Sequence, residues 1–348
     1  MNVKGTFFLG NQRFQTREFA LPELGEQDVL IQNKVCGICG TDVHIYYGEP
    51  GASDVEPPVV LGHEYSGIVV KTGQAVRNVS VGDHVTVDPN MYCGTCYYCR
   101  TGKKNMCTSM AAIGVNFNGG FAEYSVVPAA QCIPVSKDLS FEAAAMSEPL
   151  ACCIRGIDRA EIKAGMSVCV IGGGPIGLLM VQLAKLAGAC AVILSEPVQI
   201  RRELGLKLGA TYAIDPIAAP IAEQIQALTG RPGVDVVIEC VGNSKATEQA
   251  FAAADKGATI LLFSVSSPDR TYDLNLFDAF RRELTVRTSF VNPDTQQRAV
   301  ALLNSGKINA DALITHRFAL EDVEAAIHKQ IANDSVKVVV CMDESESG

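Results

Sequence analysis

The sequence lacks three features that would each place it in a large class of proteins. No apolar run reaches the roughly 18 residues that a helix needs to cross a bilayer, which argues against a membrane protein. There is no basic tract, and 29 Lys and Arg against 38 Asp and Glu give a net charge of -9. Binding to phosphates requires clustered cations, so nucleic-acid binding is not expected. Low-complexity segments and internal repeats are also missing, and the composition is that of a globular protein.

The first residues, M-N-V-K-G-T-F-F-L-G-N-Q-R, have too short an apolar core for a signal peptide, and this predicts a cytoplasmic location. Thirteen cysteines are present. Disulfides are rare in a reducing cytoplasm, so we expect these cysteines to be metal ligands or small buried residues.

The chain of 348 residues exceeds the roughly 250–300 residues at which single cores stop growing, so two domains are expected. The stretch from Val168 to Glu196 is typical of a dinucleotide site. An apolar run ends in G-G-G-P-I-G at 172–177, and an amphipathic stretch and a second apolar run follow. The glycines would allow a tight turn and close approach to a pyrophosphate, and Glu196 would accept hydrogen bonds from the adenosine ribose.

Apolar runs continue to alternate with helical stretches after Glu196. They predict strands at 211–214, 234–239, 258–263 and 284–289. Together with the two strands around the glycine motif, these make a six-stranded, doubly wound parallel sheet. Such sheets bind ligands at the carboxyl ends of their strands, so we expect the cofactor beside residues 172–177, 196, 240–242 and 264–266.

The remaining parts of the chain predict a second, strand-rich domain. Short strands are expected at 29–35, 65–70, 84–88 and 121–127. A helix capped by Ser140 should run to Pro149 and be interrupted there. From about residue 290, two helices and a final strand at 337–341 should rejoin this domain.

Four cysteines with the spacing C-x2-C-x2-C-x7-C form the most specific motif, and they are Cys93, Cys96, Cys99 and Cys107. Four thiolates around one Zn²⁺ make a closed, structural site. An iron–sulfur cluster also takes four cysteines, and disulfides are a third interpretation that the compartment disfavours. The spacing and the lack of other redox motifs favour zinc.

A second group of candidate metal ligands lies earlier in the chain. Cys39, Thr41 and His44 form the pattern C-x-T-x-x-H, and G-H-E at 62–64 supplies His63 and Glu64. A thiolate, an imidazole and a carboxylate are the ligands of a catalytic zinc that keeps one position open. The sequence E-P-L at 148–150 adds Glu148, and together these residues favour a metal site over an ordinary buried histidine.

These motifs together resemble the zinc-dependent medium-chain alcohol and polyol dehydrogenases over essentially the whole chain. The matching elements are G-I-C-G-T-D-V-H at 37–44, G-H-E at 62–64, the four-cysteine lobe, G-G-F-A-E-Y at 119–124, E-P-L at 148–150, G-G-G-P-I-G at 172–177 and I-T-H-R-F at 314–318. The chain is most similar to the sorbitol, galactitol and butanediol dehydrogenase branch, because Glu148 stands where other alcohol dehydrogenases have a third zinc cysteine.

The resemblance implies an α/β architecture of two domains. A GroES-like β-barrel catalytic domain would comprise residues 1–153 and 291–348, with the structural zinc lobe at 93–107. A Rossmann NAD-binding domain with a doubly wound parallel sheet would comprise 154–290. The cofactor contacts that it implies are Gly172, Gly174, Pro175, Ile176, Gly177, Glu196 and Arg201, the last against the adenine.

The resemblance also implies an activity: NAD-dependent and zinc-dependent conversion of a secondary alcohol of a polyol or diol to a ketone. The catalytic zinc would be held by Cys39, His63, Glu64 and Glu148, the glutamates either directly or through water. The proton would leave through Thr41 and the cofactor ribose to His44. With the structural zinc there would be two zinc ions per chain, in a homo-oligomer that is a dimer or a tetramer.

Three alternatives remain open from the sequence. Sorbitol dehydrogenases carry an Arg-Tyr pair at the substrate site where this chain has Ser289 and Phe290, which favours a smaller or differently oriented polyol, or a simple diol. Threonine or a simple alcohol is a second substrate class. A relative that binds nucleotide without catalysis is a third interpretation, disfavoured because every metal ligand is present.

Overall fold

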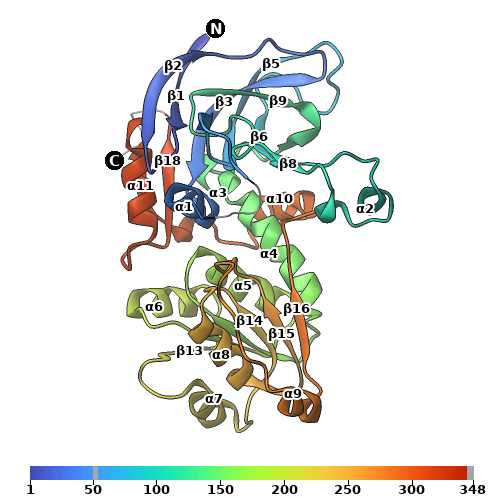
Figure 1. The fold of residues 1–348 in the computed structure, drawn as a ribbon, viewed down its shortest axis with the longest axis vertical. Coiled ribbons are helices and arrows are strands. Elements are labelled where there is room, and N and C mark those ends of the chain that lie inside the picture. Colours follow the sequence, from blue (N-terminus) through green and yellow to red (C-terminus); the bar gives the residue numbers. More distant parts are fainter. Residues whose placement is uncertain (50–53, 343–348) are drawn as a thin grey trace. The chain divides into compact units, whose positions relative to one another are not determined.

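The structure, a computed structural model, describes residues 1–49 and 54–342. The chain forms two compact units (Figure 1). Unit 1 comprises Met1–Ala151 and the segment from Asn292 onward, and unit 2 comprises Cys152–Val291. The boundaries expected from the sequence fall after residues 153 and 290.

Unit 2 contains a six-stranded parallel sheet in the order β13-β12-β11-β14-β15-β16. Its strands are β11 (Ser167–Ile171), β12 (Ala191–Ser195), β13 (Tyr212–Ile214), β14 (Val234–Glu239), β15 (Ala254–Leu262) and β16 (Thr285–Thr288). Its helices are α5 (Pro175–Leu186), α6 (Gln199–Lys207), α7 (Ile221–Thr229), α8 (Ser244–Ala253) and α9 (Leu276–Arg282). The first strand lies in the middle and the order reverses beside it, which is the predicted Rossmann arrangement.

The central strands of unit 2 are mostly apolar because helices cover both faces of the sheet. All five residues of β11 are buried. Cys169 and Ile171 of this strand pack with residues of α7 and α8 in one hydrophobic cluster. A parallel strand buried on both faces reads as a continuous apolar run rather than an alternating one, and this made the sheet recognisable in the sequence.

Unit 1 is built mainly from β-strands. A sheet with the path β10-β6-β5-β3-β18-β17 also includes β9, which pairs with β3, and a second sheet has the order β2-β1-β4. The strands are β1 (Asn2–Phe8), β2 (Phe14–Ala20), β3 (Asp28–Gly37), β4 (Val59–Val60), β5 (Glu64–Thr72), β6 (His84–Val87), β7 (Asn90–Met91), β8 (Ala111–Ala112), β9 (Tyr124–Pro128), β10 (Cys132–Pro134), β17 (Ile314–Ala319) and β18 (Lys337–Cys341). This mixed architecture agrees with the expected α/β class, and the predicted strands near 29–35, 65–70 and 84–88 are present.

The helices of unit 1 are short, and α2 lies in the projecting lobe (Figure 1). They are α1 (Gly40–Tyr47), α2 (Tyr97–Arg100), α3 (Phe141–Ala145), α10 (Gln296–Asn304) and α11 (Val323–Gln330). The helix α4 (Ser147–Ala160) begins in unit 1 and continues into unit 2. Short 3₁₀ helices occupy Lys104–Met106, Ala129–Gln131, Asp311–Leu313 and Leu320–Asp322.

Two local expectations are corrected. The helix after Ser140 ends at Ala145, before Met146, and Pro149 lies in the first turn of α4 instead of interrupting it. A proline is tolerated there because the first N–H groups of a helix have no intrahelical acceptor. The C-terminal return contains β17 in addition to the predicted β18, and the two strands pair in parallel.

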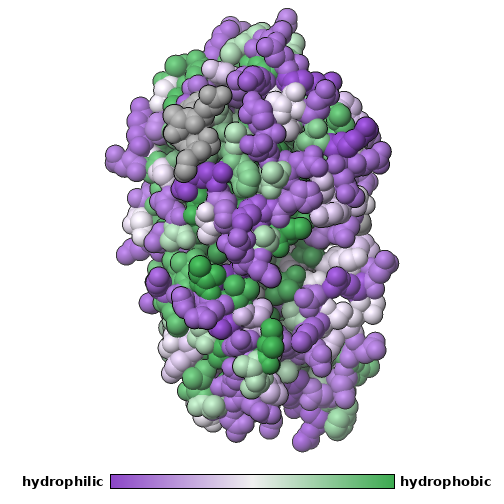
Figure 2. Space-filling view, turned by 90° about the vertical axis from the view of Figure 1, so that its left-hand side faces the viewer, coloured by the Kyte–Doolittle hydropathy of each residue, from purple (hydrophilic) through white to green (hydrophobic). Residues whose placement is uncertain are grey.

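One face of the molecule is mainly hydrophilic (Figure 2). Figure 2 shows a face on which hydrophilic residues predominate, with hydrophobic ones in small groups between them. None of the helices in residues 1–49 and 54–342 has the length and apolar character that a membrane crossing requires.

Candidate metal and cofactor sites

The end of β3 brings together three segments that are far apart in the sequence. Gly37, the last residue of β3, pairs with Glu64 on one side and with Val339 of β18 on the other. Cys39 follows directly and caps the N-terminus of α1. The sheet register therefore fixes Cys39 beside the first residue of β5 and the first residues of β18.

Cys39, His63 and Glu64 form a group whose ligand atoms all lie within 4.8 Å of one another, and His63 and Glu64 are buried. Tetrahedral ligands at about 2.0–2.3 Å from zinc lie roughly 3.3–3.8 Å from each other, so small adjustments bring these side chains to one ion. The donor set fits an open zinc site, since one sulfur, one nitrogen and one carboxylate are supplied.

The protonation of this group is strongly coupled. Burial raises the pKa of the Cys39 thiol, and the charge of Glu64 raises it further. Burial acts to lower the pKa of His63, but Cys39 and Asp42 outweigh it and raise that pKa well above its usual value. A metal binds the deprotonated thiol and imidazole, so metal affinity here should increase with pH.

Asp42 lies next to both Cys39 and His63 and accepts a hydrogen bond from the first. It is fully buried on α1, and its Oδ2 accepts a hydrogen bond of 2.8 Å from the backbone N–H of Cys39. Its Oδ1 lies 3.7 Å from Nδ1 of His63. A carboxylate behind one ring nitrogen leaves the other nitrogen available to a metal, as is usual for metal-binding histidines.

Lys337, the first residue of β18, forms a buried ion pair with Glu64, and both side chains are only 2% exposed. Its Nζ also donates a hydrogen bond of 2.8 Å to the backbone carbonyl of Ile38. The lysine brings a positive charge into a site otherwise rich in acidic groups, and it engages one oxygen of the candidate ligand Glu64.

The other predicted residues of this site lie on α1 and α4. Glu148 is buried in the first turn of α4, outside the group of three, and its charge contributes to raising the pKa of His63. Thr41 and His44 are three positions apart on α1 and so share one face. His44 Nδ1 lies 2.5 Å from a carboxylate oxygen of Glu49, a contact that the sequence pattern did not indicate.

The four cysteines at 93–107 form a second group, whose sulfur atoms all lie within 4.8 Å of one another. The Sγ atoms of Cys93 and Cys99 are 4.0 Å apart, close to the roughly 3.8 Å edge of a tetrahedral zinc–sulfur site. Backbone N–H groups point at the sulfurs, such as that of Cys96 at Cys93 Sγ over 3.3 Å. Such hydrogen bonds from the Thr95 and Cys96 segment lower the pKa of Cys93 to about 6. This geometry fits a structural Zn²⁺.

The glycine motif of unit 2 has the predicted conformation. Gly172 follows β11 with φ of 97°, and α5 begins at Pro175 with Gly174 as its N-cap. A Cβ on Gly177 would lie 1.8 Å from the carbonyl oxygen of Gly172, so only glycine fits there. A Cβ on Gly174 would meet no atom within 4 Å, which leaves open space over the helix N-terminus where a phosphate can bind. Ile176 continues the first turn of α5.

Glu196 follows β12 and lies against this motif. Its carboxylate accepts hydrogen bonds from the N–H of Gly173 at 2.5 Å and of Val198 at 2.8 Å. Arg201 and Arg202 are both on α6. Arg202 donates to the carbonyl oxygen of Glu196 and lies 3.4 Å from Asp215. The acidic residue is therefore fixed beside the glycine turn, as the sequence predicted.

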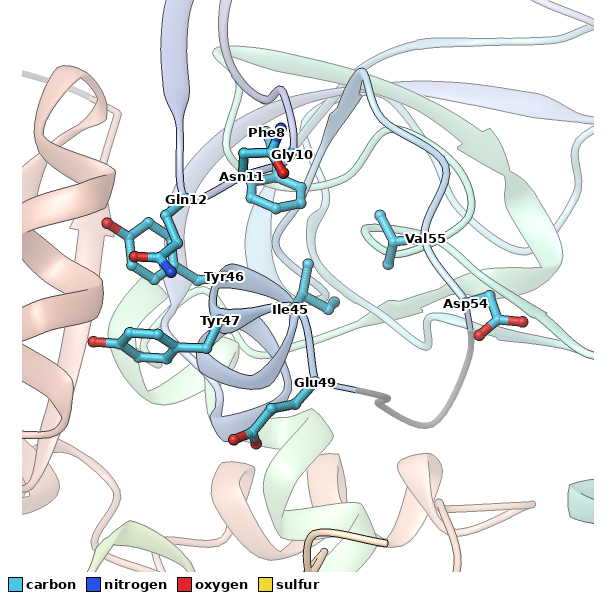
Figure 3. A pocket seen from close by; sticks show the side chains of 11 residues that line it. Phe8, Gly10, Asn11, Gln12, Ile45, Tyr46, Tyr47, Glu49, Asp54 and Val55 are labelled. Atoms are coloured by element: carbon cyan, nitrogen blue, oxygen red, sulfur yellow. The ribbon is translucent and has the colours of Figure 1, made fainter.

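A pocket of about 620 Å³ lies beside α1 (Figure 3). Its lining includes Phe8, Ile45, Tyr46, Tyr47 and Glu49. None of the candidate metal ligands lines it, so this pocket is separate from the Cys39 group.

No sequence motif assigned a role to Asp42, Lys337 or Glu49. A signal was available for two of them. Asp42 is three residues after the helix-capping Cys39, the spacing of a capping box. Lys337 is a lone charge at the start of the apolar strand K-V-V-V-C, where a buried charge needs a partner.

Comparisons with known proteins identify the family of this chain. The alcohol dehydrogenase GroES-like domain matches residues 25–137, and the zinc-binding dehydrogenase domain matches residues 175–305. An L-threonine 3-dehydrogenase of Pyrococcus horikoshii is 37% identical over 326 residues, covering 92% of this chain and 93% of that protein. D-arabinitol dehydrogenase 1 of Uromyces fabae is 35% identical, covering 92% and 91%.

Among solved structures, a zinc-binding dehydrogenase from Sinorhizobium meliloti 1021 bound to NADP is 40% identical, with a TM-score of 0.94 over 98% of this chain and 100% of that one. The relatives at 35–40% identity span nearly the whole chain, and each of the two domain matches covers a large part of one unit. The chain belongs to the zinc-dependent medium-chain alcohol and polyol dehydrogenase family.

Proposed function

We propose that this protein oxidises a secondary alcohol of a polyol or diol to a ketone with NAD, and catalyses the reverse reduction. The observation that carries the proposal is the group of Cys39, His63 and Glu64, which places three metal-ligand atoms within 4.8 Å in a buried site. The glycine motif of unit 2 supports the use of a dinucleotide.

Two zinc ions per chain are part of the proposal. Cys39, His63 and Glu64 would hold one of them, with Glu148 binding directly or through water. Cys93, Cys96, Cys99 and Cys107 would hold the other, whose role is to order the lobe. Zinc in the first site supplies a Lewis acid that lowers the pKa of a bound alcohol.

The residues of α1 provide the proton path. Thr41 Oγ1 would accept the alcohol proton, and His44 would release it to solvent. The imidazole of His44 is partly exposed, and its Nδ1 faces a carboxylate oxygen of Glu49, which orients the ring. These properties suit a group that exchanges protons with water.

NAD is the proposed cofactor because of Glu196. Its carboxylate, fixed by Gly173 and Val198, would bind a ribose diol and repel a 2′-phosphate. Arg202 could attract that phosphate, but its guanidinium already contacts the backbone of Glu196 and the side chain of Asp215. The relative crystallised with NADP makes a direct comparison of the two cofactors necessary.

L-Threonine is the second candidate substrate, because the relative from Pyrococcus horikoshii oxidises threonine according to its name. Threonine and a vicinal diol share a secondary hydroxyl next to a second polar group. They differ in the carboxylate and the ammonium group, so a substrate panel separates them.

We also propose a cytoplasmic homo-oligomer, a dimer or a tetramer. Thirteen free thiols support a reducing compartment. The strand β16 is the last of its sheet, and next to it α9 exposes Leu276, Phe277 and Phe280 by 72–79%. An open strand edge beside exposed apolar side chains is the kind of surface that a second copy covers. Replacing both phenylalanines by serine should yield monomers in sedimentation velocity.

A substrate panel tests the proposed activity. Zinc-loaded protein is mixed with alditols, vicinal diols, simple alcohols and L-threonine, each with NAD and with NADP, and absorbance of the reduced cofactor is followed. We expect the highest kcat/KM for a polyol or diol with NAD. If L-threonine were the only substrate oxidised, the assignment would change from a polyol or diol to L-threonine. A protein that binds neither cofactor and oxidises no alcohol would refute the proposal.

A further inference from the structure

Unit 2 contains a second buried carboxylate at the cofactor edge of its sheet, to which the sequence analysis assigned no role. Glu239 is the last residue of β14 and is only 2% exposed. Its Oε1 accepts hydrogen bonds from the N–H groups of Val241 at 2.6 Å and Gly242 at 2.9 Å. Its Oε2 accepts one from the hydroxyl of Ser264 at 2.5 Å. One side chain thus connects the loop after β14 with the loop after β15.

These loops leave the sheet beside the glycine motif. Glu239 pairs in register with Ile171 of β11 and with Leu262 of β15. The three residues end parallel strands, so Gly172, Cys240 and Phe263 start from the same edge. That edge is where doubly wound sheets bind their ligand.

The loop after β14 also touches the motif directly. A Cβ on Gly172 would lie 2.7 Å from Cγ2 of Val241, and Cys240 N–H donates to the carbonyl of Ile171 over 2.9 Å. A shift of Val241 would therefore be transmitted to the turn that faces the pyrophosphate. Glu196 acts in the same way from the opposite side, through the N–H of Gly173.

Stability alone is a poor explanation for this carboxylate. Within residues 1–49 and 54–342, Glu239 forms no ion pair, so its charge is compensated only by hydrogen bonds. Burying a charge without a counter-ion is costly, even when it accepts hydrogen bonds from N–H and O–H groups.

We propose that Glu239 is a positioning residue for the dinucleotide, which holds residues 240–242 and Ser264 in the conformation that borders the bound cofactor. The inference rests on the proposed use of NAD. It predicts that loss of the carboxylate weakens cofactor binding without loss of the fold, and that an isosteric amide largely restores binding. Glutamine keeps an oxygen that can accept from Val241 and Gly242.

The test compares NADH dissociation constants, measured by fluorescence titration, with thermal melts for the wild type, Glu239→Ala and Glu239→Gln. Glu239→Ala should weaken NADH binding about tenfold or more, which corresponds to about 1.4 kcal/mol. Glu239→Gln should remain within about threefold of the wild type, because the loop hydrogen bonds to its oxygen persist.

Asp235→Ala is the matched control. Asp235 lies at the other end of β14, where it accepts hydrogen bonds from Ser167 and Arg231. This variant should lower the melting temperature and leave the NADH dissociation constant unchanged. A folded Glu239→Ala protein with wild-type NADH affinity would overturn the inference, as would Asp235→Ala weakening binding equally.

If Glu239→Ala does not fold, Ser264→Ala provides the decision, since it removes one donor without burying a new charge. It should weaken NADH binding about twofold to fivefold, which corresponds to about 0.4–1 kcal/mol, and an unchanged affinity would contradict the inference. Wild-type protein that bound neither NADH nor NADPH would refute the proposed function itself, a result distinct from any of these.

Discussion

Glu64 and Lys337 are 273 residues apart in the sequence, yet they form an ion pair in which both side chains are almost completely buried. The pair exists because β3 lies between β5 and β18 and aligns their first residues. A buried ion pair contributes little net stability compared with apolar residues, but removing one member leaves an uncompensated charge.

Lys337→Met should therefore destabilise the protein by about 3–5 kcal/mol, measured by urea unfolding of the metal-free protein. The double variant Glu64→Gln/Lys337→Met should recover at least about 1 kcal/mol of this loss, because no charge remains unpaired. Lys329→Met, which breaks the exposed pair with Asp334, is the control and should cost less than about 1 kcal/mol. Equal losses of unfolding free energy in Lys337→Met and Lys329→Met would show that burial does not raise the cost of breaking an ion pair here.

The lowered pKa of Asp235 should make the stability of the folded protein depend on pH. Burial acts to raise the pKa of Asp235, but hydrogen bonds from Arg231 and Ser167 outweigh it and lower that pKa to about 2. A carboxyl whose pKa falls on folding adds stability above its unfolded pKa and loses it as the pH falls through the folded value. Asp235→Asn should cost about 1–2 kcal/mol at pH 7, and the difference from the wild type should shrink between pH 4 and pH 2. A difference independent of pH would contradict the assignment.

The cofactor preference can be tested at Glu196. The wild type should have a higher kcat/KM with NAD than with NADP. Glu196→Ser should reduce the ratio of these two values by about tenfold, because repulsion between one carboxylate and the 2′-phosphate is worth about 1–2 kcal/mol. Glu203→Gln is the control, because this exposed residue on α6 contacts only Gln199 in the described hydrogen bonds and should leave the ratio unchanged. A wild-type preference for NADP would refute the role of Glu196.

His44→Ala should slow alcohol oxidation by about 10²-fold, most strongly at low pH, where hydroxide cannot replace the missing base. Glu49→Gln should have the same pH dependence with a smaller effect, since the imidazole remains but loses its orienting carboxylate. His316→Ala, on β17, should behave like the wild type. An unchanged pH–rate profile for His44→Ala would remove this residue from the mechanism.

The features that could be predicted from the sequence depend on residues that are close together in the chain. The glycine motif between two apolar runs gave the strand, turn and helix of β11 and α5, and the spacing of the four cysteines gave their cluster. The hydrogen bonds of Glu239 and the pairing of Lys337 with Glu64 could not be predicted, because they depend on which strands become neighbours. The break at Met146 was missed because Pro149 is the stronger local signal, although a proline also suits a first turn.

The two metal sites should fail in different ways, because one would provide chemistry and the other would order a loop. Cys39→Ser removes the only thiolate of an open site. Turnover should therefore be lost, and one of the two zinc ions per chain should bind more weakly. NADH binding should persist, since the glycine motif belongs to the separate unit 2. The melting temperature should change little.

Cys99→Ser leaves three thiolates around a structural ion whose binding is coupled to the folding of residues 93–107. That variant should melt at a lower temperature and lose activity only in proportion to its loss of folded protein. Cys190→Ser, which changes an exposed thiol outside both groups, is the control for both. Metal analysis, a thermal melt and an NADH titration on each variant distinguish loss of the catalytic site from loss of the structural site. If Cys39→Ser kept its zinc and full activity while a stably folded Cys99→Ser lost turnover, the roles of the two sites would have to be exchanged.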